Sequence, residues 1–186
     1  MAWDEGGAEN CDTNVGGIYE IKGITSAGIS VTLTVKVEAF NYVSNYSFED
    51  EDTSMWTITA EGADPTDYQR NSQDAHTGDM SLHYWSESDM DFTVSQNVTG
   101  LASGKYRVEV FSQGGDFNAD SMLLLFAEVN GEETTAAIVN NGWVNWQNPQ
   151  VEVDISEGED LCIGVRVKAN AKAWGTFDDF MITKIG

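Results

Sequence analysis

The side chains in this sequence best suited to chemistry are aromatic rings that lie beside amides and carboxylates. The stretch NNGWVNWQNP places Trp143 and Trp146 among asparagines, a glycine and a proline, where large rings are hard to bury. HYWSES, QGGDFNAD and AWGTFDD repeat the combination around Trp85, Asp116 and Trp174. A flat ring packs against the apolar face of a sugar, while amide, Asp or Arg groups bond the hydroxyls around its rim. These stretches therefore indicate a sugar-binding surface.

The candidate rings differ in how we expect them to lie. Trp143 follows a glycine and is expected to be exposed, while Trp174 precedes the closing strand, where a loop ring closes a pocket. Trp85 shares a strand face with His83, so it is expected outside the main core. For Trp146, at the start of the next strand, core and ligand roles stay equally open. The predicted polar partners are Gln113, Asp116, Asn141 and Arg166, with Arg70 as a weaker candidate.

Groups for catalysis are scarce. A nucleophile needs a base within hydrogen-bond reach, and the two histidines, His76 and His83, lie neither near a cysteine nor in a G-x-S-x-G setting. With 31 Asp and Glu residues, some pair always has the spacing for glycoside hydrolysis, so that spacing carries almost no information. The sequence has no P-loop, Rossmann fingerprint or zinc-like Cys/His cluster. We therefore expect a non-enzymatic module, although two carboxylates facing each other across a cleft are not forbidden.

Charge and composition narrow the class of partner. The 186 residues include 9 Lys and Arg against 31 Asp and Glu, a formal charge of −22. This charge repels phosphate backbones and anionic lipid headgroups, so we expect neither nucleic acid nor a membrane as partner. Met1 leads straight into AWDEGG, so we expect the sequence to begin inside a longer secreted protein. Pairing of Cys11 with Cys162 stays open at this point, and two separate thiols are the favoured alternative.

Period-2 alternation dominates the chain and predicts the elements that position the rings. Residues 18–23 and 30–38 alternate around Ala27-Gly28 and predict a β-hairpin. After an acidic link, we expect strands at 55–60, 80–85, 92–98, 105–113, 122–130, 134–139, 150–155, 160–169 and 176–185, separated by Gly-containing turns. Many short strands without helical periods predict an all-β fold, an antiparallel β-sandwich of jelly-roll type.

The alternation also predicts which side chains face outward. Tyr106 and Val108 point one way and Phe111 and Gln113 the other. Arg166 is expected on the side of its strand that faces away from the core. Phe111, Gln113 and Arg166 together favour a shallow groove for a polar ligand. An ordinary outer face with one exposed phenylalanine is an equally open alternative.

From about residue 45 to 185 the chain resembles the galactan-binding carbohydrate-binding modules of family sixty-one. The matching stretches are NYSFEDEDTSMWT, DAHTGDMSLHYWSE, FTVSQNVTGLASGKYRVEVFSQGGD, NNGWVNWQ and AWGTFDDFMI. The S-L-H-Y-W, S-Q-G-G-D and G-W-V-N-W stretches carry the galactan resemblance, while the others are shared by many jelly-roll modules with a galactose-binding-like fold. The resemblance implies binding of β-1,4-galactan or galacto-oligosaccharides. It also implies a covalently attached endo-galactanase that the module targets to pectic side chains, outside a bacterial cell.

Residues 3 to 38 resemble the C-terminal half of a bacterial Ig-like domain, through WD followed by VGGIYEIKGITSAGISVTLTVKV. The resemblance implies a partial Ig-like spacer over residues 1–41, followed by a carbohydrate-binding module over residues 42–186. Its hairpin would dock on the module or pair with another copy.

Family jelly rolls commonly hold a structural calcium ion that ties the first strand to the last. The positions that match its ligands are Ser47 by its carbonyl, Glu49, Asp74 and Gly78 of the DAHTG turn, and Asp178. Calcium prefers oxygen ligands of these kinds. The alternative is that Glu49 and Asp178 are solvated edge residues.

Two further functions stay open beside galactan binding. The same fold could bind another plant polysaccharide, such as xylan or a β-glucan, because the scaffold does not determine the ligand. A cell-surface adhesion or spacer module without a sugar site is the other alternative, and buried loop tryptophans would favour it.

Overall fold

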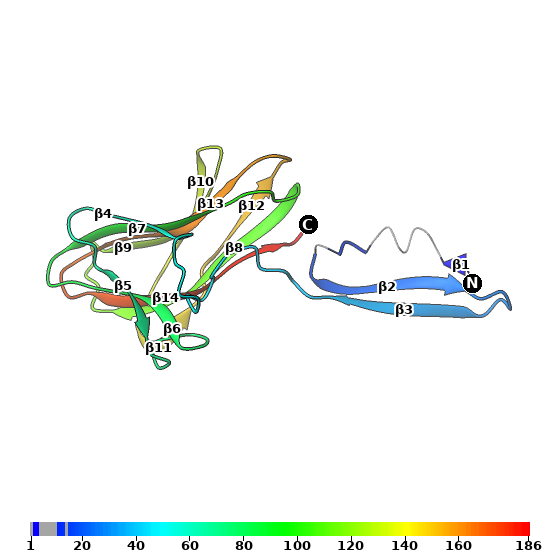
Figure 1. Cartoon of the computed structure of the whole chain (residues 1–186), viewed down its shortest axis with the longest axis horizontal. Helices are drawn as coiled ribbons and strands as arrows, with labels where there is room; N and C mark the ends of the chain where they lie inside the picture. The colour runs from blue at the N-terminus through cyan, green and yellow to red at the C-terminus, as the bar shows by residue number, and fades with distance from the viewer. Residues whose placement is uncertain (1, 4–10, 14) are drawn as a thin grey trace.

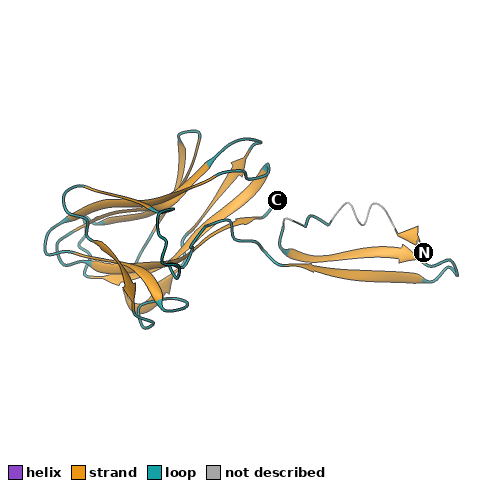
Figure 2. Cartoon of the chain, in the orientation of Figure 1, coloured by secondary structure: helices purple, strands orange, loops and turns teal. Residues whose placement is uncertain are grey.

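The structure, a computed structural model, describes residues 2–3, 11–13 and 15–186. Within these ranges the chain forms strands and no helix, which confirms the all-β prediction (Figure 2). No described segment is a helix long and apolar enough to cross a membrane. The strands build a sandwich of two antiparallel sheets and a separate N-terminal sheet (Figure 1).

The two sheets of the sandwich differ in size. The five-stranded sheet has the order β10 (Glu132–Ala137), β9 (Met122–Val129), β13 (Leu161–Ala169), β7 (Met90–Val98) and β4 (Thr57–Ala60). The six-stranded sheet has the order β11 (Gly142–Gln147), β8 (Gly104–Gly115), β14 (Trp174–Lys184), β6 (Met80–Trp85) and β5 (Thr66–Arg70), and β12 (Gln150–Ile155) pairs with β8 as well. Every strand pair is antiparallel, so alternate residues of each strand face the space between the sheets.

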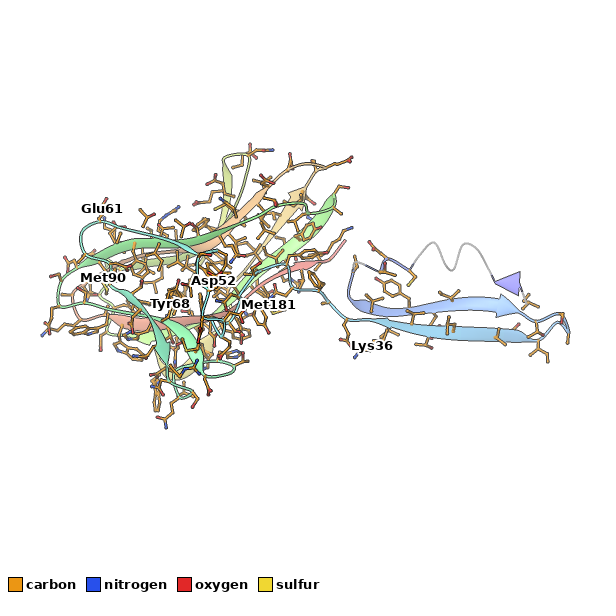
Figure 3. The ribbon with its side chains drawn as sticks, viewed as in Figure 1. Lys36, Asp52, Glu61, Tyr68, Met90 and Met181 are labelled. Carbon is orange, nitrogen blue, oxygen red and sulfur yellow. The ribbon has the colours of Figure 1, made fainter. Side chains whose placement is uncertain are left out.

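Side chains from both sheets fill that space (Figure 3). Tyr106 and Val108 of β8 are buried in it, as their alternation predicts. The same holds for Leu161, Ile163, Val165 and Val167 of β13. Trp56 is also buried, with its ring centroid 4.7 Å from that of Phe180. Burial of these apolar surfaces is the main force that holds the two sheets together.

The main disagreement with the sequence expectation is at β5 and β11. β5 reads TDYQR, a polar stretch that carries little apolar alternation, and it lies at the edge of its sheet, where a polar strand is tolerated. β11 reads GWVNWQ and lies between the predicted strands at 134–139 and 150–155, among residues that favour turns. Its register with β8 is interrupted between Gly142 and Gln147, and Val144 has a φ of 59°. An irregular edge strand of this kind shows turn residues in its sequence because its backbone is locally turn-like.

The N-terminal hairpin agrees with its prediction. β2 (Gly17–Ile24) pairs with β3 (Ser30–Val37) across a turn in which Gly28 has a φ of 77°, a conformation that glycine adopts without strain. β1 (Ala2–Trp3) pairs with the end of β2. The hairpin projects away from the sandwich in Figure 1. Its origin as part of an Ig-like spacer, and the boundary at residue 41, stay predictions. Cys11 and Cys162 are free thiols, as expected.

Candidate functional site

The outer face of the six-stranded sheet brings the predicted tryptophans together. Trp174 of β14 lies opposite Trp85 of β6 on one side and opposite Gly115 of β8 on the other. Trp143 lies on β11, which β8 separates from β14, and is 55% exposed, while Trp85 is 44% exposed. Leu82 and Tyr84 of β6 point into the core, which confirms that Trp85 faces outward. Large rings left exposed on one face of a sheet commonly mark a binding surface.

Trp174 is held in place by its neighbours. Its indole Nε1 donates a hydrogen bond to Oδ2 of Asp116 at 3.0 Å. Gly115 provides the space for the ring, because a Cβ at that position would lie 3.3 Å from ring atoms of Trp174. Asp116 has a φ of 64°, and its carbonyl accepts a hydrogen bond from the side chain of Asn170. Several contacts therefore determine the orientation of this ring.

A pocket of about 380 Å³ opens in front of Trp174. Its lining combines this ring with Gly115, Asp116, Phe117, Asn140, Asn141 and Gly142. Asn140 donates from Nδ2 to Oγ of the buried Ser112 at 2.9 Å, so its amide has a defined position. Burial raises the pKa of the neighbouring Tyr84 hydroxyl, and the side chain of Asn140 partly offsets this rise. A pocket with an aromatic wall and several amide and carboxylate groups suits a polar ring-shaped ligand.

Apart from its glycines, two members of this pocket were missed from the sequence. Asn140 stands next to the predicted Asn141, and Phe117 lies in the QGGDFNAD stretch that contains the predicted Asp116. The repeated amides of NNGWVNW were the available signal for Asn140. Two other pockets in the described part of the chain, lined by acidic residues such as Asp91 and Glu152, contain no tryptophan.

Trp143 is oriented by a segment distant in sequence. Its Nε1 donates to Oδ1 of Asp74 at 2.8 Å. The side-chain amide of Gln113 links the 71–79 turn to β11. Its Nε2 donates to the carbonyl of Asp74, and its Oε1 accepts from the backbone N–H of Val144. Gln113 is completely buried, so the prediction that it contacts sugar directly is wrong. It is buried because the 71–79 turn and β11 both fold over its strand.

Trp146 lies deeper than Trp143. Its ring packs edge-on against the ring of His76, with centroids 5.1 Å apart. The ring of His76 in turn stacks on that of Phe111, with centroids 3.7 Å apart. His76 also pairs through Nδ1 with Asp179 at 2.6 Å. The structure thus packs one tryptophan of the NNGWVNW stretch against other rings and displays the other. A role for either ring in sugar binding stays a prediction.

Three predicted polar partners occupy different places. Asn141 is exposed at the pocket, where its Oδ1 accepts a hydrogen bond from the amide of Asn145. Arg166 lies in β13 of the five-stranded sheet and forms two bonds with Glu133, at 2.9 and 3.1 Å. The prediction of a groove shared by Phe111, Gln113 and Arg166 is therefore wrong, because Phe111 and Gln113 lie in β8 of the six-stranded sheet. Arg70 lies at the end of β5 remote from Trp85 and pairs with Asp79 at 3.7 Å.

The predicted calcium ligands are only partly brought together. Oε1 of Glu49 accepts backbone hydrogen bonds from Asp79 and Met80, while Oδ2 of Asp178 accepts those of His76 and Thr77. Glu49 and Asp178 therefore border the same turn, which contains Gly78. Ser47 is buried beside Tyr46, whose carbonyl accepts the N–H of Phe180 in β14.

Asp74 does not fit this set. Its carboxylate accepts from Trp143 and from Asn71 instead. Among the described residues, no group of three or more His, Cys, Asp or Glu side chains is arranged to hold a metal. Burial and the neighbouring Asp179 raise the pKa of Asp178 to about 7. A bound cation would oppose that rise, because it favours the ionised carboxylate.

Solved structures similar to this chain include several carbohydrate-binding modules. The module TmCBM61, solved in complex with β-1,4-galactotriose, is 27% identical; the match covers 78% of this chain and 99% of that module, with a TM-score of 0.70. The CBM22-1 xylan-binding domain of Xyn10C from Paenibacillus barcinonensis is 21% identical over 75% of this chain and 92% of that domain, with a TM-score of 0.52. A family 16 module is 12% identical over 76% of this chain and 99% of that chain, also with a TM-score of 0.52.

The last two matches show the fold alone. No family model matches the chain, and no curated protein matches it. The larger part of this chain is a module similar to TmCBM61, which confirms the resemblance to family sixty-one and the predicted β-sandwich class. Two of these three similar structures are carbohydrate-binding modules and the third is a xylan-binding domain; that this chain is a non-enzymatic module stays a prediction.

Proposed function

We propose that this chain binds β-1,4-galactan, or galacto-oligosaccharides of the same linkage, without catalysing a reaction. Trp174 would stack on one galactose ring in the pocket, and Asp116, Asn140 and Asn141 would bond its hydroxyls. Trp143 and Trp85 would extend the contact along the sugar chain. The single observation that carries this proposal is the pocket in front of Trp174, where one ring and three polar side chains converge.

The choice of galactose would depend on its axial O4 hydroxyl. A site that selects this sugar must place a hydrogen-bonding group above the ring plane and leave the other face free for stacking. Asp116 supports this assignment, since one carboxylate oxygen bonds Trp174 while the side chain is exposed at the pocket. A buried polar group that loses its sugar hydroxyl is left unpaired, so a sugar with an equatorial O4 binds less tightly.

The partners that we propose follow from the same similarity. In the parent protein, a covalently attached endo-galactanase would be held near pectic side chains, outside a bacterial cell. Attachment raises the effective concentration of the enzyme at its substrate without adding contacts to the active site. A spacer without a sugar site is disfavoured, because Trp143 and Trp85 expose their rings instead of burying them.

We also propose a structural calcium ion at the turn that contains Gly78. The carbonyls of Ser47 and Gly78 and the carboxylates of Glu49 and Asp178 would provide its oxygen ligands. Glu49 and Asp178 approach this turn from segments far apart in the chain, so an ion there would tie the first part of the module to β14. Asp74 is left out of this set.

Isothermal titration tests the sugar assignment. Galactotriose is titrated into the protein, with xylotriose and cellotriose as matched sugars. Heat of binding with galactotriose alone is the expected result. Heat with another trisaccharide only would keep the module and overturn the galactan assignment. No heat of binding with any of the three sugars would favour a spacer module without a sugar site.

A further inference from the structure

A second set of polar and aromatic side chains lies on the other side of Trp174 from the pocket. β14 runs between β8 and β6, so Trp174 has Gly115 and the pocket on one flank and Trp85 on the other. Two residues before Trp85, on the same face of β6, is His83. The register places His83 between Asp67 of β5 and Thr176 of β14.

His83 is bonded at one nitrogen only. Its Nδ1 lies 2.7 Å from Oδ1 of Asp67. An ionised carboxylate can only accept a hydrogen bond, so Nδ1 carries the hydrogen and Nε2 of the neutral ring is an acceptor. None of the described residues bonds Nε2, and the hydroxyl of the neighbouring Thr176 has no hydrogen-bond partner among them. The acceptor at Nε2 is therefore available to a ligand.

Stability of the fold does not account for the His83–Asp67 pair. The side chain of Asp67 is 57% exposed, and a hydrogen bond at an exposed carboxylate adds little to folding because water competes for the same oxygen. Trp85 likewise exposes its ring beside them instead of packing into the core. An oriented imidazole next to an exposed ring is the arrangement that a sugar needs, with one face for stacking and one acceptor for a hydroxyl.

We propose that Trp85 and His83 form a second sugar subsite, in which Nε2 of His83 accepts a hydrogen bond from a hydroxyl of the sugar stacked on Trp85. Asp67 is a positioning residue that holds the imidazole in the acceptor tautomer. The inference rests on the proposed function, because the occupant is the next residue of the galactan chain that fills the pocket at Trp174. The cross-strand pairing of Trp174 with Trp85 makes the two subsites continuous. His83 and Trp85 are successive residues on one face of β6, so they are roughly 6–7 Å apart, a distance that one sugar ring spans.

The dependence of affinity on chain length tests the subsite. Galactobiose, galactotriose and galactotetraose are titrated into the unchanged protein and into His83→Phe, which keeps an aromatic ring but removes both nitrogens. We expect the unchanged protein to gain affinity with chain length. His83→Phe should lose roughly three- to tenfold in affinity for the longest sugar and little for the shortest, because one neutral hydrogen bond is removed. Trp85→Ala should show the same dependence on length.

A separate pair of variants tests the role of Asp67. In Asp67→Ala no side chain holds the hydrogen on Nδ1, so the neutral ring also takes the tautomer with the hydrogen on Nε2, which removes the acceptor. The ¹⁵N shifts of the imidazole should report this change of tautomer, and the loss of affinity should match that of His83→Phe. Asp154→Ala, which removes an exposed carboxylate from β12, serves as the control and should change neither quantity.

The outcomes separate the two proposals. A gain with chain length that survives both His83→Phe and Trp85→Ala overturns the subsite and leaves galactan binding intact. A tautomer change in Asp67→Ala without loss of affinity overturns the acceptor role of His83. No binding of any galacto-oligosaccharide by the unchanged protein overturns the proposed function itself, and the subsite with it.

Discussion

The indole Nε1 of Trp143 lies 2.8 Å from Oδ1 of Asp74, a residue 69 positions earlier in the chain. The same relationship occurs twice more on this face of the sheet, where Trp174 donates to Asp116 and the imidazole of His83 is bonded to Asp67. Each carboxylate restricts the rotation of a ring that is exposed, as in Trp143, or half-buried, as in Trp174 and His83. Rings that are oriented before a ligand arrives lose less conformational entropy on binding, which favours affinity.

Asp74→Ala tests this orienting role. Loss of the carboxylate frees the ring of Trp143, so we expect the affinity for galactotriose to fall roughly three- to tenfold, as for one lost hydrogen bond. The thermal midpoint should change little, because Trp143 is largely exposed. Isothermal titration and thermal unfolding give the two quantities. Asp120→Ala is the control, since it removes an exposed carboxylate that bonds no tryptophan, and equal losses in both variants would contradict the prediction.

Trp174→Ala and Trp56→Ala should separate binding from folding. Trp174 lines the pocket, so its truncation is expected to weaken galactotriose binding at least about tenfold, or about 1.4 kcal/mol. Trp56 is buried against Phe180, so its truncation is expected to lower the free energy of unfolding by about 3–5 kcal/mol. Chemical denaturation followed by circular dichroism measures the second effect. A Trp174→Ala variant that unfolds as readily as Trp56→Ala would assign Trp174 to the core.

Arg166→Ala should leave sugar binding unchanged. The guanidinium pairs with Glu133 on the five-stranded sheet, and it lies 5.2 Å from the ring centroid of Phe126. The hydrogen bond to the carboxylate of Glu133 is the largest cause of the raised pKa of Arg166. Titration with galactotriose checks the expectation. A tenfold loss of affinity in this variant would place a sugar site on the five-stranded sheet and would contradict the site at Trp174.

Calcium should stabilise the module through Glu49 and Asp178. An ion that binds only the folded protein adds about 2.7 kcal/mol at a concentration one hundred times its Kd, and the thermal midpoint rises accordingly. Thermal unfolding with added calcium, and again with excess chelator, measures the difference. Glu49→Gln and Asp178→Asn should abolish the response, whereas Asp74→Ala should keep it. A chelator that leaves the midpoint unchanged would exclude the ion at this turn.

The sequence predicted the faces of individual strands well. Alternation in YRVEVFSQ and LCIGVRVK correctly assigned the core side chains of β8 and β13, because the side chains of a strand alternate with the local backbone. It also placed Trp85 outside the core and identified the stretches around Trp143 and Trp174. β5 and β11 were missed because edge strands can be polar or irregular, and their sequences then resemble loops.

Arg166 illustrates where sequence reasoning stops. Its strand face was predicted correctly, yet the sheet that contains the strand depends on pairing between segments distant in the chain, which no local pattern determines. Gln113 also faces outward as predicted, but the turn at 71–79 and β11 cover it. The sequence by itself therefore determined most of the strands, the aromatic side chains and several of their polar neighbours, through local periodicity and residue chemistry. The tertiary structure alone decided that Asp74 orients Trp143, that Asp67 orients His83 and that Trp85 adjoins Trp174, because these contacts arise only when distant strands pair in one register.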